Sequence, residues 1–187
     1  MTDAEILVLP AARLRSRAAA AAVASTHAIL GGDRDGFDPL LAEARRLEQV
    51  RCRGEGEEAR WSLTAAGEAE LAAHLGAEAD RVGRAELVTA YEAFLPHNRG
   101  FLAALASEQP LAVLEELVGR VGPVLQALTA RLARFEGYAA RFAHALRMAA
   151  DDPRWIAGPT VDSLHTIWFE LHEHLLATLG RHRTDEH

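Results

Sequence analysis

The stretch VRCRGEGEEARWSL, residues 50–63, decides the expected fold of this chain. On both sides of the glycine-rich segment GEGEE, apolar side chains alternate with polar ones, a period of two that is typical of half-buried strands. The alternating residues are Val50, Arg51, Cys52 and Arg53 before that segment, and Ala59, Arg60, Trp61, Ser62 and Leu63 after it. Two short strands around a glycine-rich turn predict an antiparallel β-hairpin.

Helices are expected on both sides of this hairpin. The capping box Thr2-Asp3-Ala4-Glu5 predicts a first helix, which Pro10 kinks or divides. An alanine-rich second helix covers about 18–28, and the breaker cluster GGDRDG ends it. A third helix is expected over 39–49, because proline is tolerated at a helix start, and Thr64 caps a fourth. This order of three helices, a hairpin and a helix is that of a winged helix-turn-helix.

The stretches DPLLAEARRLEQV, VRCR and WSLTAAGEAEL carry a family resemblance. In them, Leu63-Thr64-Ala65-Ala66-Gly67 fits an LT-x-x-G step from wing to helix. The first 75 residues thus resemble the winged-helix domain of MarR- or PadR-like bacterial regulators. The stretches YEAFLPHNRGFL and DSLHTIWFELHEHLLATLG make the whole chain similar to a bacterial group in which this domain precedes a helical segment. The resemblance implies a DNA-binding fold.

Helical periodicity dominates the chain from about residue 77 onward. Pro96, Gly119 and Pro123 are expected to break helices, and Gly180 is expected to cap the last one. The expected helices cover about 77–95, 98–107, 111–119, 123–149 and 160–179. The second half therefore predicts an all-α helical bundle.

Length and composition fit one ordinary domain or two small ones, with 187 residues, 49% hydrophobic and 25% charged. We expect a mainly α protein, with a winged helix-turn-helix domain over 1–76 and a helical effector-binding and dimerisation segment over 77–187. The single cysteine, Cys52, excludes an intramolecular disulfide, and no apolar run approaches the roughly 18 residues that span a bilayer. Because the N-terminus also lacks the features of a signal peptide, a cytoplasmic protein is expected.

The half expected to bind DNA is acidic. Residues 1–80 hold 9 Arg against 14 Asp plus Glu, a net charge of −5, whereas residues 81–187 hold 11 against 13, a net of −2. The wing tip, GEGEE at 54–58, brings three carboxylates toward the expected DNA backbone. Net charge does not exclude a local basic patch. The candidate DNA-binding residues are Arg45, Arg46, Arg51, Arg53 and Arg60, and a solvated, ion-paired surface remains the alternative interpretation.

The last expected helix contains HTIWFELHEHLL, residues 165–176. At about 100° per residue, one arc collects the apolar residues Leu164, Ile167, Trp168, Leu171, Leu175 and Leu179. His165 and His172 lie at the edge of this arc. The opposite face, expected in solvent, holds Asp162, Thr166, Glu170, Glu173 and His174. The histidines are therefore expected beside a buried aromatic surface.

A small-molecule pocket fits this helix better than a metal site. His165 and His172 lie two turns apart, about 10.5 Å along the axis, and the chelating pair Glu170 and His174 is expected to form an ion pair in solvent. Aromatic groups with a few convergent polar groups are typical of a ligand pocket, and arginine there favours an anionic or carbonyl-bearing ligand. The candidate ligand-binding residues are Tyr91, Asn98, Arg99, Arg134, Tyr138, Arg141, His165, Trp168, Phe169 and His172. Histidines satisfied at the edge of the core, beside packing aromatics, remain the alternative.

These patterns lead to three hypotheses. The first is a homodimeric transcriptional regulator that binds double-stranded DNA through the helix 39–49 and the wing 50–63, with an effector in the helical half. The second is a winged-helix protein without DNA binding, acting as a small-molecule-binding or catalytic component of a metabolic pathway. The third is a protein-interaction module. No nucleophile motif, phosphate loop or dinucleotide fingerprint is present, so neither catalytic residues nor a cofactor is expected.

Overall fold

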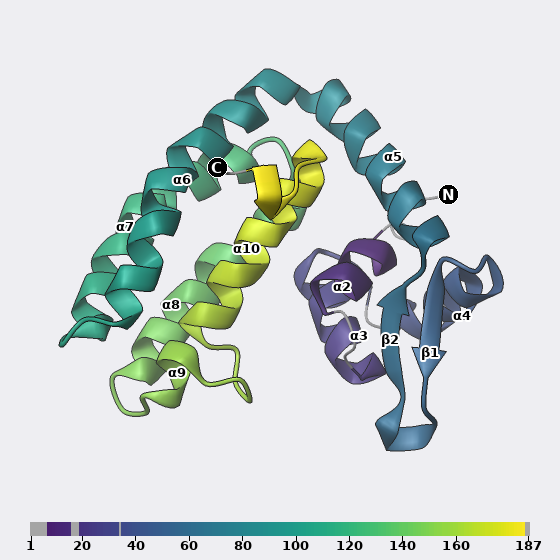
Figure 1. The fold of residues 1–187 in the computed structure, drawn as a ribbon, viewed down its shortest axis with the longest axis horizontal. Helices are drawn as coiled ribbons and strands as arrows, with labels where there is room; N and C mark the ends of the chain where they lie inside the picture. Colours follow the sequence, from purple (N-terminus) through teal and green to yellow (C-terminus); the bar gives the residue numbers. More distant parts are fainter. Residues whose placement is uncertain (1–6, 16–18, 34, 186–187) are drawn as a thin grey trace. The chain divides into compact units, whose positions relative to one another are not determined.

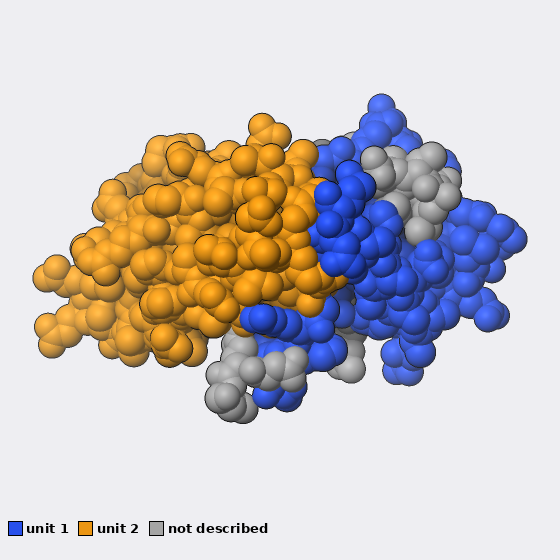
Figure 2. All heavy atoms as spheres, turned by 90° about the horizontal axis from the view of Figure 1, so that it is seen from above, with its two compact units in different colours: residues 1–81, 180–187 blue, residues 82–179 orange. Residues whose placement is uncertain are grey.

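The computed structural model describes residues 7–15, 19–33 and 35–185 (Figure 1). The chain divides into two compact units, residues 1–81 with 180–187 and residues 82–179, which Figure 2 distinguishes by colour. They are called unit 1 and unit 2 below, and each is described by itself. The boundary expected at 76–77 falls inside the helix Ala65–Val82.

Unit 1 carries the three helices, hairpin and fourth helix expected from the sequence. Its elements are α2 (Val8–Leu14), α3 (Ala20–Ile29), α4 (Phe37–Arg46), β1 (Val50–Arg53), the 3-10 turn η1 (Gly56–Glu58), β2 (Arg60–Leu63), α5 (Ala65–Val82) and the 3-10 turn η3 (Arg183–Asp185). The strands β1 and β2 form a two-stranded antiparallel sheet. A mainly α protein with one short hairpin is thus confirmed for the described residues.

The register of the hairpin separates an apolar face from a basic one. Val50 pairs with Leu63 and Cys52 with Trp61, while Arg51 pairs with Ser62 and Arg53 with Arg60. Since side chains opposite one another point to the same face of a sheet, the apolar pairs share one face and the arginines the other. Val50 and Leu63 are buried, so the apolar face packs on the helices of unit 1.

Helix α4 is shorter than the expected 39–49, because a turn at Glu48 ends it after Arg46. Glu48 has φ 57°, in the left-handed region that usually favours glycine. Its N–H donates to the carbonyl of Arg45 at 3.0 Å, and the N–H of Gln49 donates to that of Ala44 at 2.9 Å. This bonding is a Schellman C-cap, and it sends the chain directly into β1.

Helix α5 begins at the predicted cap and leaves room only for glycine in its first turn. Thr64 Oγ1 accepts the N–H of Gly67 at 3.1 Å, and the N–H of Thr64 donates to the carbonyl of Gln49 at 3.0 Å. A Cβ added at Gly67 would lie 1.9 Å from that carbonyl oxygen. The glycine of the LT-x-x-G step is therefore required by the close approach of α5 to the start of the hairpin.

Pro10 lies in α2, and the kink or division expected there stays a prediction, because the helix expected from Thr2 begins outside the described residues. It is the third residue of α2, a position in the first turn where its missing N–H has no helical partner to lose. The expected capping box at residues 2–5 lies outside the described residues.

All the regular elements of unit 2 in the described chain are helices. Its elements are α6 (Arg84–Leu105), α7 (Pro110–Thr129), the 3-10 turn η2 (Ala133–Phe135), α8 (Gly137–Ala149), α9 (Arg154–Ala157) and α10 (Leu164–Leu179). Helices α6 and α7 pack along one another, and α10 contacts α6, α8 and α9 (Figure 1). None of the described helices combines the length and the apolar character that crossing a bilayer requires.

Several helix boundaries predicted for this half are wrong. Pro96 lies inside α6, and Gly119 and Pro123 lie inside α7, so the expected breaks do not occur. A break comes instead at Gly83, whose φ of 105° an L-residue rarely adopts. An interior proline costs about 3 kcal/mol, less than the burial of the large apolar residues before and after it. In α6 these are Leu87, Tyr91, Phe94 and Phe101.

The last helix also begins later than expected, at Leu164 in place of about 160. Ser163 is buried, and its Oγ accepts the N–H of Thr166 at 3.3 Å. Its carbonyl accepts the N–H of Ile167 at 2.9 Å. Ser163 thus caps the helix, and the apolar arc predicted for it is confirmed, with every member buried.

Candidate functional site

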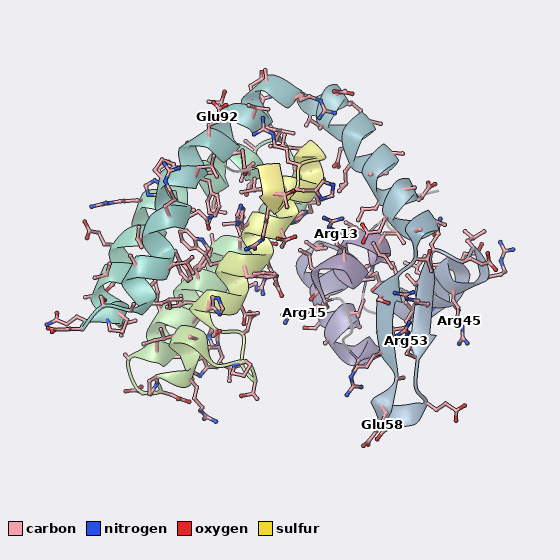
Figure 3. All side chains as sticks on the ribbon, in the orientation of Figure 1. Arg13, Arg15, Arg45, Arg53, Glu58 and Glu92 are labelled. Carbon is pink, nitrogen blue, oxygen red and sulfur yellow. The ribbon has the colours of Figure 1, made fainter. Side chains whose placement is uncertain are left out.

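The outer face of the hairpin in unit 1 carries three of the five candidate DNA-binding arginines. Arg51, Arg53 and Arg60 are all exposed, and the register places them on one face together with Ser62. Figure 3 shows Arg53 on the strands and Glu58 beyond their end, at the tip. The alternation of β1 and β2 thus brings together arginines that lie up to nine residues apart in the sequence.

These arginines keep their positive charge uncompensated. Arg51 Nε donates to Ser62 Oγ at 3.1 Å, and one terminal nitrogen of Arg60 donates to the carbonyls of Glu57 at 2.7 Å and Ala59 at 3.0 Å. The partners are neutral oxygens in both cases. Within the described residues, none of Arg51, Arg53 and Arg60 forms an ion pair with a carboxylate.

The two arginines at the end of α4 differ from each other. The Arg45 guanidinium lies 5.9 Å from the centre of the Trp61 ring, a cation–π contact, and has no carboxylate partner in the described part of the chain. Arg46 is bonded to both carboxylate oxygens of Glu43, at 2.7 and 2.5 Å. These bonds lower the pKa of Glu43 below its ordinary value. Arg46 is therefore partly neutralised, whereas Arg45 is not.

A shallow depression of about 410 Å³ connects the end of α4 with the hairpin. Arg45 and Arg51 contribute to its lining, as does the carboxylate-bearing Glu48. The structure thus brings one arginine of the third helix and one of the hairpin to the same surface feature.

The tip of the hairpin is acidic, as the sequence indicates. Glu55, Glu57 and Glu58 are exposed, and Figure 3 shows Glu58 at the far end of the strands. The hairpin therefore carries two opposite charges along its length, basic on the strands and acidic at the tip.

In unit 2, the candidate Arg141 is buried and bound by two carboxylates. Its Nε donates to Asp162 at 2.8 Å, and a terminal nitrogen donates to Asp162 at 2.7 Å and to Glu170 at 2.6 Å. Burial works to lower the pKa of Arg141, but the bonds and charges of both carboxylates outweigh it and raise that pKa above the ordinary value. Arg141 therefore stays charged and pairs inside the protein.

The candidates Arg134 and Tyr138 meet at His174, which lies in the core. Arg134 Nε donates to His174 Nε2 at 2.8 Å, and a terminal nitrogen of Arg134 donates to Thr178 Oγ1 at 3.0 Å. Tyr138 Oη lies 3.2 Å from His174 Nδ1. Because a guanidinium only donates, His174 accepts at Nε2 and carries its proton on Nδ1. Burial, and then the charge of Arg134, lower the pKa of His174 well below its ordinary value.

The prediction that one face of the last helix lies in solvent is thus wrong for Glu170 and His174. Glu170 is 2% and His174 1% exposed, because Arg134 and Phe135 of η2 contact His174 and Arg141 of α8 binds Glu170. A helix that packs against neighbours on two sides cannot keep a wet face of the expected width. The polar residues remain there because Arg134, Tyr138 and Arg141 provide partners.

The remaining candidates occupy two environments. His172 is buried, with its ring centre 6.5 Å from that of Tyr91, and Trp168 Nε1 donates to Asn98 Oδ1 at 3.0 Å. Arg99, His165 and Phe169 are exposed. His165 is stacked on Phe101 at 6.3 Å between ring centres. The ten candidate ligand residues are therefore divided among buried bonds, core packing and the surface.

Sequence reasoning missed Asp162, Glu170, His174 and Thr178 as members of buried clusters. A signal was present in the spacing. Glu170, His174 and Thr178 recur every four residues. Arg134 and Tyr138 are also four residues apart, and Arg141 follows three residues later. Two helical stripes of hydrogen-bonding groups with complementary chemistry predict contact between the helices that carry them.

No group of three or more His, Cys, Asp or Glu side chains among the described residues is arranged to hold a metal ion. Comparison with known proteins gives no family: no family model matches the chain, and neither curated proteins nor solved structures provide a significant match. The resemblance to MarR- or PadR-like regulators therefore stays a prediction.

Proposed function

We propose that this chain is a winged-helix protein that binds double-stranded DNA through the hairpin and the end of α4, in the role of a transcriptional regulator. The observation that carries the proposal is the register of β1 and β2. It aligns Arg51, Arg53 and Arg60 on one exposed face, without a carboxylate partner among the described residues. Uncompensated arginines on one surface are the electrostatic footprint of a phosphate-binding protein.

In this mode, α4 enters the major groove and the flat face of the hairpin follows the backbone. The exposed side of α4 includes Pro39 and Ala42, small residues that permit close approach, and then Arg45 and Arg46. Phosphate contacts position a protein without reading sequence. Sequence preference would then rest first on Arg45, whose guanidinium suits guanine in the major groove, because Arg46 is shared with Glu43.

The acidic hairpin tip favours the second candidate function, a winged-helix scaffold without DNA binding. This second function does not depend on a ligand site at Arg134, Tyr138 and Arg141. Arg134 and Tyr138 already bind His174, and Arg141 already binds Asp162 and Glu170. We therefore assign these residues a structural role within the proposal.

The test is DNA binding by the purified protein across a salt series. Fluorescence anisotropy measures binding to a duplex from the region upstream of the protein's own gene and to a random duplex. The triple variant Arg51→Ala/Arg53→Ala/Arg60→Ala should weaken binding to both duplexes. It should also lower the slope of log affinity against log salt by roughly 0.9 for each phosphate that the variant no longer neutralises. Arg147→Ala, which removes one exposed arginine of α8 outside this face, is the control.

The two candidate functions give different results. Binding that the triple variant loses and the control retains supports the proposal. A wild-type protein that does not bind either duplex at low salt favours the scaffold. Binding that the triple variant leaves unchanged would show that the hairpin face is not the DNA-binding surface.

A further inference from the structure

The outer face of α6 in unit 2 presents one acidic and one basic side chain without partners among the described residues. Glu92 and Arg99 are both exposed and lie seven residues apart, which places them on the same side of the helix two turns from each other. Neither forms an ion pair or hydrogen bond with another described side chain. Figure 3 shows Glu92 directed away from α10. The face therefore carries two separated and unlike charges.

Most of the other exposed side chains on this face are small and apolar. Its other exposed residues are Ala85, Thr89, Ala93, Pro96, Leu102, Ala103 and Ala106, and exposed Glu86, which pairs with Arg131, lies at its edge beside Ala93. Leu102 is 67% exposed, more than the other exposed large hydrophobic side chains of the described chain. The Thr89 hydroxyl donates to the carbonyl of Ala85 at 3.0 Å, so its hydrogen-bonding capacity is used within the helix. Small side chains allow another helix to approach closely.

Pro96 adds a polar group to the same face. Proline has no N–H, so the carbonyl oxygen of Glu92, four residues earlier, lacks its regular helical donor. An arginine that reaches the Glu92 carboxylate could also donate to this oxygen.

We propose that the outer face of α6 is a dimerisation surface, and that it binds the same face of a second copy of this chain in antiparallel orientation. With the two-fold axis between Leu95 and Pro96, each Glu92 lies opposite Arg99 of the second copy. Ala85 then lies opposite Ala106, and Thr89 and Leu102 of the second copy lie at the same level on the two flanks of the contact. A parallel arrangement would place Glu92 against Glu92, so charge complementarity selects the antiparallel one.

The size of this surface determines how strong the dimer is. Helix α6 has 22 residues, about 33 Å of length. A single pair of helices falls below the roughly 1,600 Å² of a standard stable interface. The dimer is therefore a reversible one, dependent on protein concentration and, because its central contacts are exposed ion pairs, on salt.

The experiment is sedimentation velocity of the full chain at low salt, over concentrations from about 1 to 300 µM, a range that brackets micromolar affinity. The wild type should show a monomer–dimer equilibrium. Glu92→Arg and Arg99→Glu should each raise the dissociation constant by about tenfold or more, because the two-fold axis repeats each like-charge contact. The charge swap Glu92→Arg/Arg99→Glu should restore the dimer.

The controls separate this surface from general effects of charge and folding. Glu115→Arg, at an exposed glutamate of α7, makes the same charge change outside the face and should leave the dimer intact. Circular dichroism of each variant checks that the helices are formed. A wild type that stays monomeric throughout the range overturns the proposal. So does a dimer that Glu92→Arg leaves intact, or a charge swap that fails to restore association. None of these outcomes depends on whether the chain binds DNA.

Discussion

The arginines of the two units contrast in what surrounds them. Arg141 of unit 2 is buried and held by two carboxylates, and Arg134 is buried against a neutral histidine and a threonine hydroxyl. Arg53 and Arg60 of unit 1 are exposed and meet no carboxylate within the described residues. These arginines therefore stabilise the fold in unit 2 and remain available to a partner in unit 1.

This contrast shows how a structural arginine is distinguished from a binding one. A buried guanidinium must find its partners inside the protein, because leaving a charge unpaired in the interior is costly. An exposed guanidinium keeps its hydration at little cost and can exchange it for phosphate. Burial and pairing together, and not sequence position, separate the two roles.

The largest expected effect is the loss of the buried arginine. Arg141→Ala leaves Glu170 buried without the guanidinium that neutralises it, and should destabilise unit 2 by about 3–5 kcal/mol. Urea unfolding followed by circular dichroism measures the free energy, with Arg147→Ala as the control at an exposed arginine. A destabilisation no larger than that of the control would mean that the buried pair does not stabilise the unit.

The next effect is a pH dependence that belongs to His174. Its pKa is lowered in the folded protein, so the unfolded chain binds a proton first as pH falls below the ordinary value of 6.5. Stability is complete above that pH and decreases between it and the lowered pKa, by up to about 1.4 kcal/mol for each pH unit. Urea midpoints at pH 7.0 and 5.5 measure this decrease. His174→Gln should reduce it, and an unchanged slope in that variant would contradict the assignment.

A smaller effect is expected from the acidic tip of the hairpin. Glu55→Gln/Glu57→Gln/Glu58→Gln removes three exposed negative charges near the expected DNA backbone, and should raise affinity for any duplex severalfold at low salt. The gain should disappear at high salt, because screening removes long-range repulsion. Anisotropy titrations at two salt concentrations measure both. Weaker binding by this variant would mean that the tip itself contacts the DNA or positions the strands.

The smallest effect separates two exposed arginines of unit 1. Arg53→Ala should reduce DNA affinity more than Arg46→Ala, because Arg46 is already shared with both oxygens of Glu43. One phosphate contact contributes roughly 0.9 to the slope of log affinity against log salt. The slopes measured for Arg53→Ala and Arg46→Ala should therefore differ by part of that value. Equal slopes would show that the ion pair opens on binding. Glu43→Gln, which frees Arg46 without removing it, then gives a direct check.

The hairpin illustrates what could be predicted from the sequence. Period-two alternation and the glycine-rich turn predict its two strands and the arginines that share one face of them. Side chains along a strand alternate between its two faces whatever lies around the strand. The cap at Thr64 is equally local. The candidate site of unit 1 was therefore accessible before the structure, apart from the pairing of Arg46 with Glu43.

The helices of unit 2 show where sequence reasoning failed. Pro96 and Pro123 are strong local breakers, yet α6 and α7 continue through them, because burial on both sides of each proline exceeds its local cost. His174 and Glu170 were expected in solvent, and the packing of η2 and α8 buries them. A helical wheel places residues on a face but does not show how many neighbours cover that face.

The sequence alone determined the short-range features of this protein: its mainly helical content, the hairpin with its basic strands and acidic tip, and the caps at Thr64 and Gly180. Each depends on backbone geometry over a few residues. Tertiary structure decided which prolines interrupt a helix, which polar residues are buried, and which arginines are neutralised. Those outcomes depend on contacts between Arg134 and Thr178 or Arg141 and Glu170, whose partners are 44 and 29 residues apart in the chain and are brought together by packing.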